Sequence, residues 1–157
     1  TFNTGIERLP ALLKEYSRTM FIGHANSFWA HISADVPANV AYPTGPVKPG
    51  GLTDRMLSEF PNLYGDLSAT SGRNALARSP EFSVEFLKRH QDKLIFGSDC
   101  GCRDGRGTGQ TNPFLLVAGK CVARETLTAL TQLSSPEIFR KISSQNVIRL
   151  LKLDRWQ

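Results

Sequence analysis

LIFGSDC, residues 94–100, is the stretch that decides the fold. Leu94 to Phe96 form a short apolar run, which predicts a buried strand. Two small residues then lead to Asp99, so a carboxylate stands directly after the strand. An aspartate at this point is either a turn former or helix cap, or a site residue held at the end of a strand. The choice between these two roles of Asp99 depends on the residues that follow the other predicted strands.

Two further segments predict strands of the same kind. TMFIGHA, residues 19–25, runs to His24, and NLYGDLSA, residues 62–69, contains Asp66. Stretches with helical periodicity lie around these strands; they are residues 6–16, 52–60, 80–90, 122–132, 135–141 and 144–152, the last with Ser144 as its expected N-cap. A Pro- and Gly-rich loop is expected over 26–51, a helical turn over 74–77 and a polar, Gly-rich loop over 100–113.

The order of these elements predicts an α/β fold. Strands about 30 to 45 residues apart with helices between them indicate parallel βαβ units. The polar and Gly-rich residues follow the carboxyl ends of the strands, where ligands bind in open α/β sheets and in (β/α)8 barrels. Three strands are too few for either fold. We therefore expect residues 1–157 to be the last three βα units, strands 6–8, of a larger TIM-like barrel domain, with its N-terminal strands absent; a start at Thr1 without Met agrees with processing or truncation.

Composition narrows the function classes. The chain has 157 residues, 40% of them hydrophobic and 21% charged, as expected for one globular domain. No apolar run or leader-like segment predicts a membrane span or secretion, so the default compartment is the cytoplasm. The net charge of +5 comes from 19 Lys and Arg that form no basic cluster. Because clustering rather than total charge marks a phosphate-binding face, we expect no nucleic-acid partner.

His24 and Asp99 are the candidates for chemistry, because each follows a strand and the two strands are separated by one other. Imidazole and carboxylate groups suit a zinc- or manganese-type ion, and a carboxylate beside the ion can act as a base. Structural roles for both residues remain the alternative. Cys100 and Cys102 form a C-x-C pair and Cys121 stands alone. Their spacing does not predict a zinc site, and we expect reduced thiols.

Four segments in order carry a resemblance to a known family: FIGHA around His24, NLYGDLSA at 62–69, GSD ending on Asp99, and SSQNVIRLLKL at 143–153 with Asn146. The chain resembles the amidohydrolase superfamily. More closely, it is similar to the amidohydrolase-related, metal-dependent (β/α)8 barrels that include the aminocarboxymuconate-semialdehyde decarboxylase-like enzymes. The resemblance covers nearly the whole chain.

The resemblance implies roles for individual residues. Asp99 matches the strand-eight aspartate, which binds metal and serves as general base. His24 matches the strand-six histidine, which binds a second metal or polarises substrate. Asp66 matches no metal ligand and is expected to support its loop by hydrogen bonding. The implied cofactor is a divalent metal, zinc first, with manganese or iron as alternatives.

Further residues are candidates for contact with a small-molecule substrate. Arg73, with Arg103 and Arg106, favours an anionic one. Trp29 either walls the substrate pocket or packs on a loop.

The chain departs from the family pattern in its ligand set. The strand-one His-x-His pair and the strand-five histidine do not occur in it. It therefore carries part of a site, is expected to be inactive alone, and needs the missing N-terminal barrel half as a partner; homo-oligomers remain open. The implied function is hydrolysis of a C–N or C–O bond by a metal-activated water. Metal-dependent decarboxylation, or a non-catalytic α/β scaffold or binding protein, is the alternative.

Overall fold

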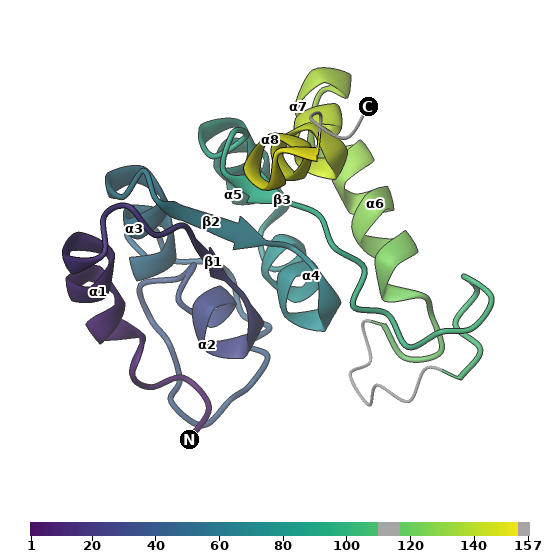
Figure 1. The fold of residues 1–157 in the computed structure, drawn as a ribbon. Helices are drawn as coiled ribbons and strands as arrows, with labels where there is room; N and C mark the ends of the chain where they lie inside the picture. The colour runs from purple at the N-terminus through teal and green to yellow at the C-terminus, as the bar shows by residue number, and fades with distance from the viewer. Residues whose placement is uncertain (110–116, 154–157) are drawn as a thin grey trace.

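A three-stranded parallel sheet lies at the centre of the computed structural model, which describes residues 1–109 and 117–153 (Figure 1). The strands β1 (Phe21–Gly23), β2 (Leu63–Asp66) and β3 (Leu94–Ile95) pair in the order β1-β2-β3. Gly65 is in register with both Gly23 and Leu94. The strands are short apolar runs linked by helices, so the sequence-based prediction of parallel βαβ units is confirmed.

One face of the sheet is covered by helices. They are η1 (Ile6–Arg8), α1 (Leu9–Glu15), α2 (Ala25–Ala30), α3 (Leu52–Glu59), α4 (Ala69–Ala77) and α5 (Pro80–Arg89). Helices α2 and α4 lie side by side against the sheet (Figure 1). Gly65 allows close packing there, because a Cβ would come within 3.3 Å of the Trp29 ring and 3.1 Å of a Leu94 methyl group. Trp29, Phe86 and the strand residue Leu63 are almost fully buried in this core.

The opposite face of the sheet is open at β1. Residues in register on parallel strands project to the same side, so Ile22 and Tyr64 share a face. Ile22 is 48% exposed and Tyr64 is half-buried, whereas their neighbours on the other face pack against the core. Parallel sheets are almost always covered on both faces, because their side chains are apolar on both. This face is therefore uncovered at β1, whereas Ile95, on the same face at β3, is buried.

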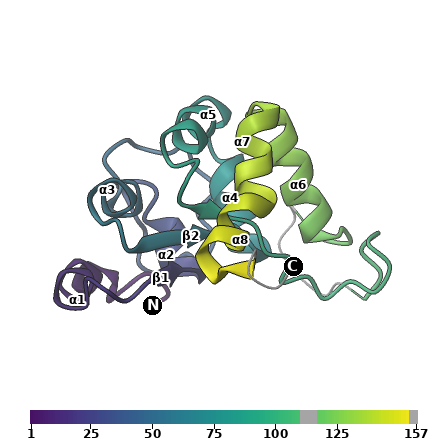
Figure 2. The ribbon, with the colours of Figure 1, turned by 45° about the horizontal axis from the view of Figure 1, so that its top comes forward.

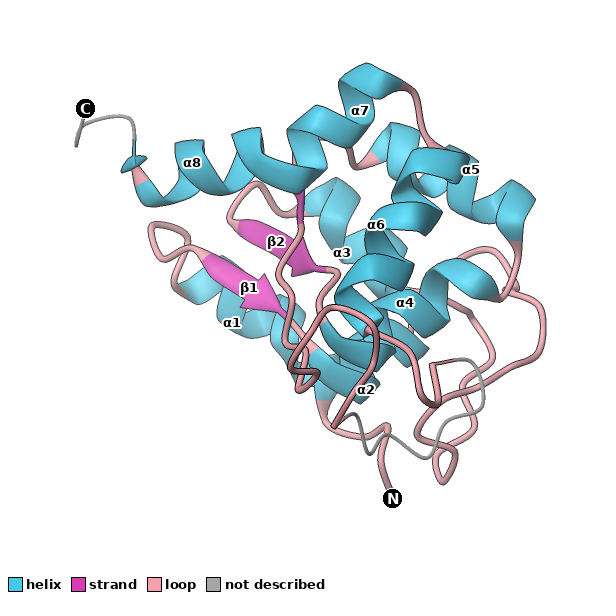
Figure 3. Cartoon of the chain, turned by 90° about the vertical axis from the view of Figure 1, so that its right-hand side faces the viewer, coloured by secondary structure: helices cyan, strands magenta, loops and turns pink. Residues whose placement is uncertain are grey.

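The C-terminal part packs beside β3. Helices α6 (Val122–Leu133), α7 (Pro136–Arg140) and α8 (Asn146–Leu151) are arranged with a π-helical turn, η2 (Lys141–Gln145), between the last two. Figure 3 shows α7 and α8 as one continuous helical run. Ser144 therefore caps no helix, and its hydroxyl donates to the Arg140 carbonyl one turn earlier. The predicted interruption between two helices before residue 144 is wrong, because the π-helical turn η2 joins α7 directly to α8.

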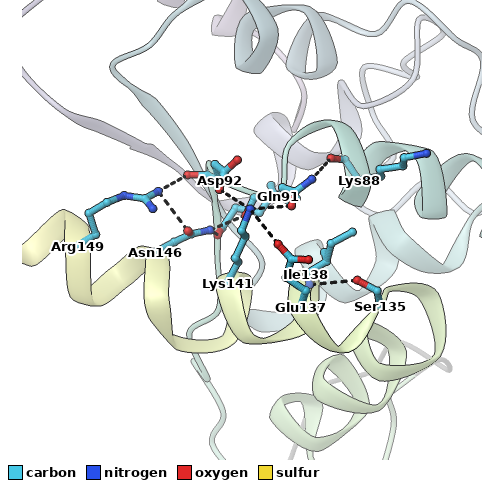
Figure 4. Close-up of polar contacts among 10 residues, drawn as sticks. Lys88, Gln91, Asp92, Ser135, Glu137, Ile138, Lys141, Asn146 and Arg149 are labelled. Carbon is cyan, nitrogen blue, oxygen red and sulfur yellow. Dashed lines mark hydrogen bonds and ion pairs between the residues drawn. The ribbon is translucent and has the colours of Figure 1, made fainter.

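Asn146 fastens this helical run to the sheet. It is fully buried, and its side-chain amide donates to the Gln91 and Leu94 carbonyls, each at 2.7 Å (Figure 4). Lys141 reaches the carboxylate of Asp92 at 3.1 Å from the same side. These contacts place the last helices next to the short strand β3.

Two further sequence-based expectations need correction. Residues 26–51 are not all loop, because α2 occupies Ala25–Ala30 and buries Phe28 and Trp29. The helical turn expected at 74–77 is the end of a longer helix, α4, that begins at Ala69. In Figure 2, α1 lies at one end of the molecule and α6 and α7 at the other. None of the helices in the described residues has the length and apolar character needed to cross a bilayer.

Candidate functional site

The carboxyl ends of the three strands lie at one edge of the sheet and have an unusual backbone in common. A non-glycine residue with positive φ follows each strand: Ala25 at 68°, Ala69 at 57° and Asp99 at 38°. This region is sterically unfavourable for residues with a Cβ, and such outliers concentrate at sites where side chains are held in place for a function. The backbone thus turns sharply at each strand end, directly beside the polar residues.

Asp66 organises this edge. Its carboxylate accepts hydrogen bonds from the Ser68 backbone N–H at 2.9 Å and from the Ser68 hydroxyl at 2.6 Å. The same Oδ2 lies 3.0 Å from His24 Nδ1. Asp66 therefore supports the loop after β2, as the resemblance implies, and also holds His24, the residue after β1, which the sequence reasoning did not predict.

The contact with Asp66 determines the state of the His24 ring. An ionised carboxylate only accepts hydrogen bonds, so this contact favours the tautomer with the proton on Nδ1. The second ring nitrogen, Nε2, points to Asp99, whose Oδ2 lies 3.7 Å away. In a neutral ring Nε2 is an acceptor, and two acceptors facing each other attract a cation between them, either a proton or a metal ion. The structure thus brings together the two residues singled out from the sequence.

A hollow of about 330 Å³ opens beside His24. It lies between the N-terminal segment and α2, and its wall includes Arg8, Ser27 and Phe28. Ser27 Oγ is buried and has no hydrogen-bond partner among the described residues. The hollow therefore places Arg8 and the apolar ring of Phe28 next to the imidazole.

Two residues predicted to contact substrate lie elsewhere. Trp29 is only 2% exposed; its ring packs edge-on against Phe28 and Phe86, and its indole N–H donates to the Asp66 carbonyl at 2.7 Å. Its place in the structure is the core. Arg73 is half-buried in α4, where burial lowers the pKa of its guanidinium and the charge of Glu125 partly opposes that effect. Neither residue lines the hollow beside His24.

Three thiols meet in the loop that follows β3. Cys100 Sγ lies 3.2 Å from Cys102 Sγ and 3.4 Å from Cys121 Sγ. Burial would raise the pKa of the Cys100 thiol, but hydrogen bonds from the backbone N–H groups of Cys102 and Ala123 and from the neighbouring thiols bring it to about 7. Burial raises the pKa of Cys121 above its ordinary value.

Sequence reasoning missed this cluster because Cys121 is 19 positions beyond the C-x-C pair. The available signal was the Gly-rich character of the intervening segment, which permits the chain to fold back. Within residues 1–109 and 117–153, these thiols are the only three metal-ligating side chains whose ligand atoms converge within 4.8 Å. His24 and Asp99, by contrast, are only two ligand residues.

Comparison of the chain with protein-family models, with curated proteins and with solved structures found no match. The function therefore has to be argued from the geometry of the site.

Proposed function

We propose that the strand-end residues form part of the active site of a metal-dependent, amidohydrolase-like hydrolase of C–N or C–O bonds. One observation carries this proposal: His24 is held by Asp66 through Nδ1 and presents Nε2 to the Asp99 carboxylate. A metal-binding histidine typically donates its other ring N–H to a carboxylate, which fixes the tautomer and raises the basicity of the ligand nitrogen. The Asp66–His24–Asp99 series matches that arrangement.

The donor atoms fit a divalent ion of the zinc type. His24 Nε2 and one Asp99 oxygen would be its ligands, and both atom types are ordinary zinc ligands. When bound, the metal would supply Lewis acidity and lower the pKa of a water molecule. Asp99 is more than half exposed, so its second oxygen is free to accept a proton from the attacking water.

The hollow beside His24 supplies the substrate subsite of this proposal. Arg8 would pair with an anionic group of the substrate, and the Phe28 ring would contact its apolar part. Arg8 takes the role that the sequence reasoning gave to Arg73. A hollow of about 330 Å³ suits a small molecule rather than a polymer.

Two ligands fall short of the three that a catalytic zinc ordinarily requires. We propose that the remaining ligands come from barrel strands outside residues 1–157, which would pack on the uncovered face that carries Ile22. A (β/α)8 barrel buries that face, because its interior is filled by side chains from all its strands. The open face at β1 therefore supports the same proposal as the incomplete ligand set.

The test is metal content and hydrolysis, measured on this chain and on the protein extended upstream to include a His-x-His segment. We expect stoichiometric zinc outside the thiol cluster only in the extended protein, together with turnover of an amide, ester or lactone from a panel of anionic substrates. His24→Gln and Asp99→Asn should each abolish turnover, and Asp66→Asn should weaken metal binding about 10- to 100-fold.

Asp92→Asn is the matched control, because Asp92 is an exposed carboxylate that pairs with Lys141 away from the strand ends. It should leave zinc content and turnover unchanged. The proposal is wrong if the extended protein turns over a substrate and His24→Gln or Asp99→Asn retains full activity. Release of CO2 in place of hydrolysis would assign the site to decarboxylation, and extended protein that folds without binding metal would favour a scaffold.

A further inference from the structure

The thiols of Cys100, Cys102 and Cys121 form a cluster that the hydrolase proposal does not use. Two of them come from the segment after β3 and the third is the residue that precedes α6. All three sulfur atoms lie within 4.8 Å of one another, and Cys100 Sγ lies 3.2 Å from Cys102 Sγ and 3.4 Å from Cys121 Sγ. Three side chains from two separate segments thus point to one place.

The backbone holds both segments in position. Asp104 accepts hydrogen bonds from the Arg106 N–H, the Thr108 N–H and the Thr108 hydroxyl, which closes a tight turn after the C-x-C pair. Gly107, at a φ of 107°, lies so close to Gly119 that a Cβ would sit 2.2 Å from the Gly119 oxygen. The two legs of the loop are therefore in direct backbone contact beside the thiols.

Backbone N–H groups also point at the sulfur atoms. Cys100 Sγ accepts from the N–H groups of Cys102 and Ala123, and Cys121 Sγ accepts from the N–H of Arg124. The last two donors belong to the first turn of α6, where N–H groups have no partner within the helix. Donors of this kind orient ligands and stabilise the negative charge of metal-bound thiolates.

We infer that Cys100, Cys102 and Cys121 bind one Zn²⁺ ion, with the fourth coordination position open to water or a small ligand. Thiolates are soft ligands that favour zinc among the common divalent ions. With Zn–S bonds of about 2.3 Å, tetrahedral geometry places sulfur atoms about 3.8 Å apart. The separations of 3.2 and 3.4 Å therefore need to widen by about 0.6 and 0.4 Å, which side-chain rotation can supply.

Zn²⁺ binding changes both the protonation and the net charge of the site. Three thiols release three protons to solvent as Zn²⁺ enters, which leaves a site with one net negative charge. Basic side chains lie in the same short segments and oppose that charge: Arg103 and Lys120 are sequence neighbours of the ligands, and Arg124 lies in the first turn of α6. The site uses neither His24 nor Asp99, so it stands independently of the hydrolase proposal.

The test uses the 157-residue chain, reduced and stripped of metal with a chelator under anaerobic conditions. Zn²⁺ is titrated against a chromophoric chelator, and Co²⁺ serves as a spectroscopic probe. We expect one equivalent of tight binding and an intense thiolate-to-cobalt charge-transfer band. Cys102→Ser and Cys121→Ser should each weaken Zn²⁺ binding by at least about 100-fold, whereas His24→Gln should leave the affinity and the band unchanged.

A second measurement on the unmodified chain guards against variants that fail to fold. Bound Zn²⁺ should protect Cys100, Cys102 and Cys121 from alkylation, as read by peptide mapping. Three outcomes overturn the inference: absence of the charge-transfer band, unchanged affinity when Cys102 and Cys121 are both replaced by serine, or equal alkylation with and without Zn²⁺. Loss of two hydrogens by mass spectrometry in metal-free chain kept in air, together with no Zn²⁺ binding after reduction, would assign the cluster to a disulfide.

Discussion

His24 shows how a single side chain acquires a defined chemical state from its neighbours. The Asp66 carboxylate at 3.0 Å keeps the proton on Nδ1, and the same carboxylate is itself fixed by two hydrogen bonds from Ser68. Because the proton is on Nδ1, Nε2 is the nitrogen available to a cation beside Asp99. The orientation of the ring is thus set by contacts from β2 and the loop that follows it.

A second carboxylate–histidine pair serves stability. Asp54 lies 2.6 Å from Nε2 of His90, which is 2% exposed, and also pairs with Arg89 at 3.0 Å. Burial would raise the pKa of Asp54, but the hydrogen bonds and charges of His90 and Arg89 outweigh it and lower the pKa. The pair joins α3 to the end of α5, away from the strand ends.

The direction of that pKa shift predicts how stability changes with pH. A carboxyl group whose pKa is lower in the folded state stabilises the fold above its unfolded pKa of about 3.9. It loses that contribution as the pH falls through the folded value. We expect Asp54→Asn to lower the free energy of unfolding by about 2 kcal/mol at pH 7 and to reduce the loss of stability in acid. Urea denaturation between pH 7 and pH 2 measures both effects.

The exposed Asp92→Asn is the control for that experiment, because surface ion pairs contribute little. An Asp54→Asn chain with the stability of the unmodified chain at pH 7 and the same slope in acid would contradict the prediction.

At the scale of elements, the C-terminal helices depend on one buried amide. Asn146 occupies the junction of η2 and α8, and its two donors satisfy carbonyls on either side of β3's start. The strand β3 has only two residues and therefore makes few backbone hydrogen bonds to its neighbour β2. The amide therefore links α8 to β3 and to the residue Gln91 before it through two hydrogen bonds.

Asn146→Ala should lower the free energy of unfolding by about 3 kcal/mol, because the Leu94 and Gln91 carbonyls lose their partner inside the structure. Ser144→Ala, two residues earlier, is the matched control; its hydroxyl bonds only within its own helical run and is expected to change stability little. Chemical denaturation of both variants measures the two changes in the free energy of unfolding. Equal effects of the two substitutions would show that Asn146 does not fasten the helix.

At the scale of the whole molecule, the uncovered face of the sheet is the main departure from an ordinary α/β layer arrangement. β1 is an edge strand, and Ile22 on it is 48% exposed. An exposed edge and an apolar face both favour association with another chain.

We therefore expect this chain to self-associate, and Ile22→Lys to shift it toward monomer. A charge at this position makes burial of the face unfavourable. Val84→Lys on α5 is the matched control, because Val84 is 40% exposed but lies on a helix away from the sheet. Sedimentation equilibrium measures the change. The prediction does not hold if the unmodified chain is monomeric over the accessible concentration range, or if both variants dissociate equally.

Local patterns in the sequence determined much of the fold. Apolar runs predicted all three strands, and helical periodicity predicted α3, α5 and α6 to within a residue or two, since burial of one face leaves a direct trace in residue order. Very short helices, and helices that follow one another without an interruption, could not be predicted in this way. α2 has six residues, too few for a period, and η2 joins two helices without any break in composition.

For the sites, the sequence by itself placed His24 and Asp99 at strand ends, and parallel pairing then brought those ends together. Only the tertiary structure decided that Asp66 holds the His24 ring, that Trp29 is a core residue, and that Cys121 joins Cys100 and Cys102. The physical reason is distance along the chain. A strand or helix is determined by neighbours within a few residues, whereas these contacts span 19 to 42 positions and depend on how loops return to the sheet.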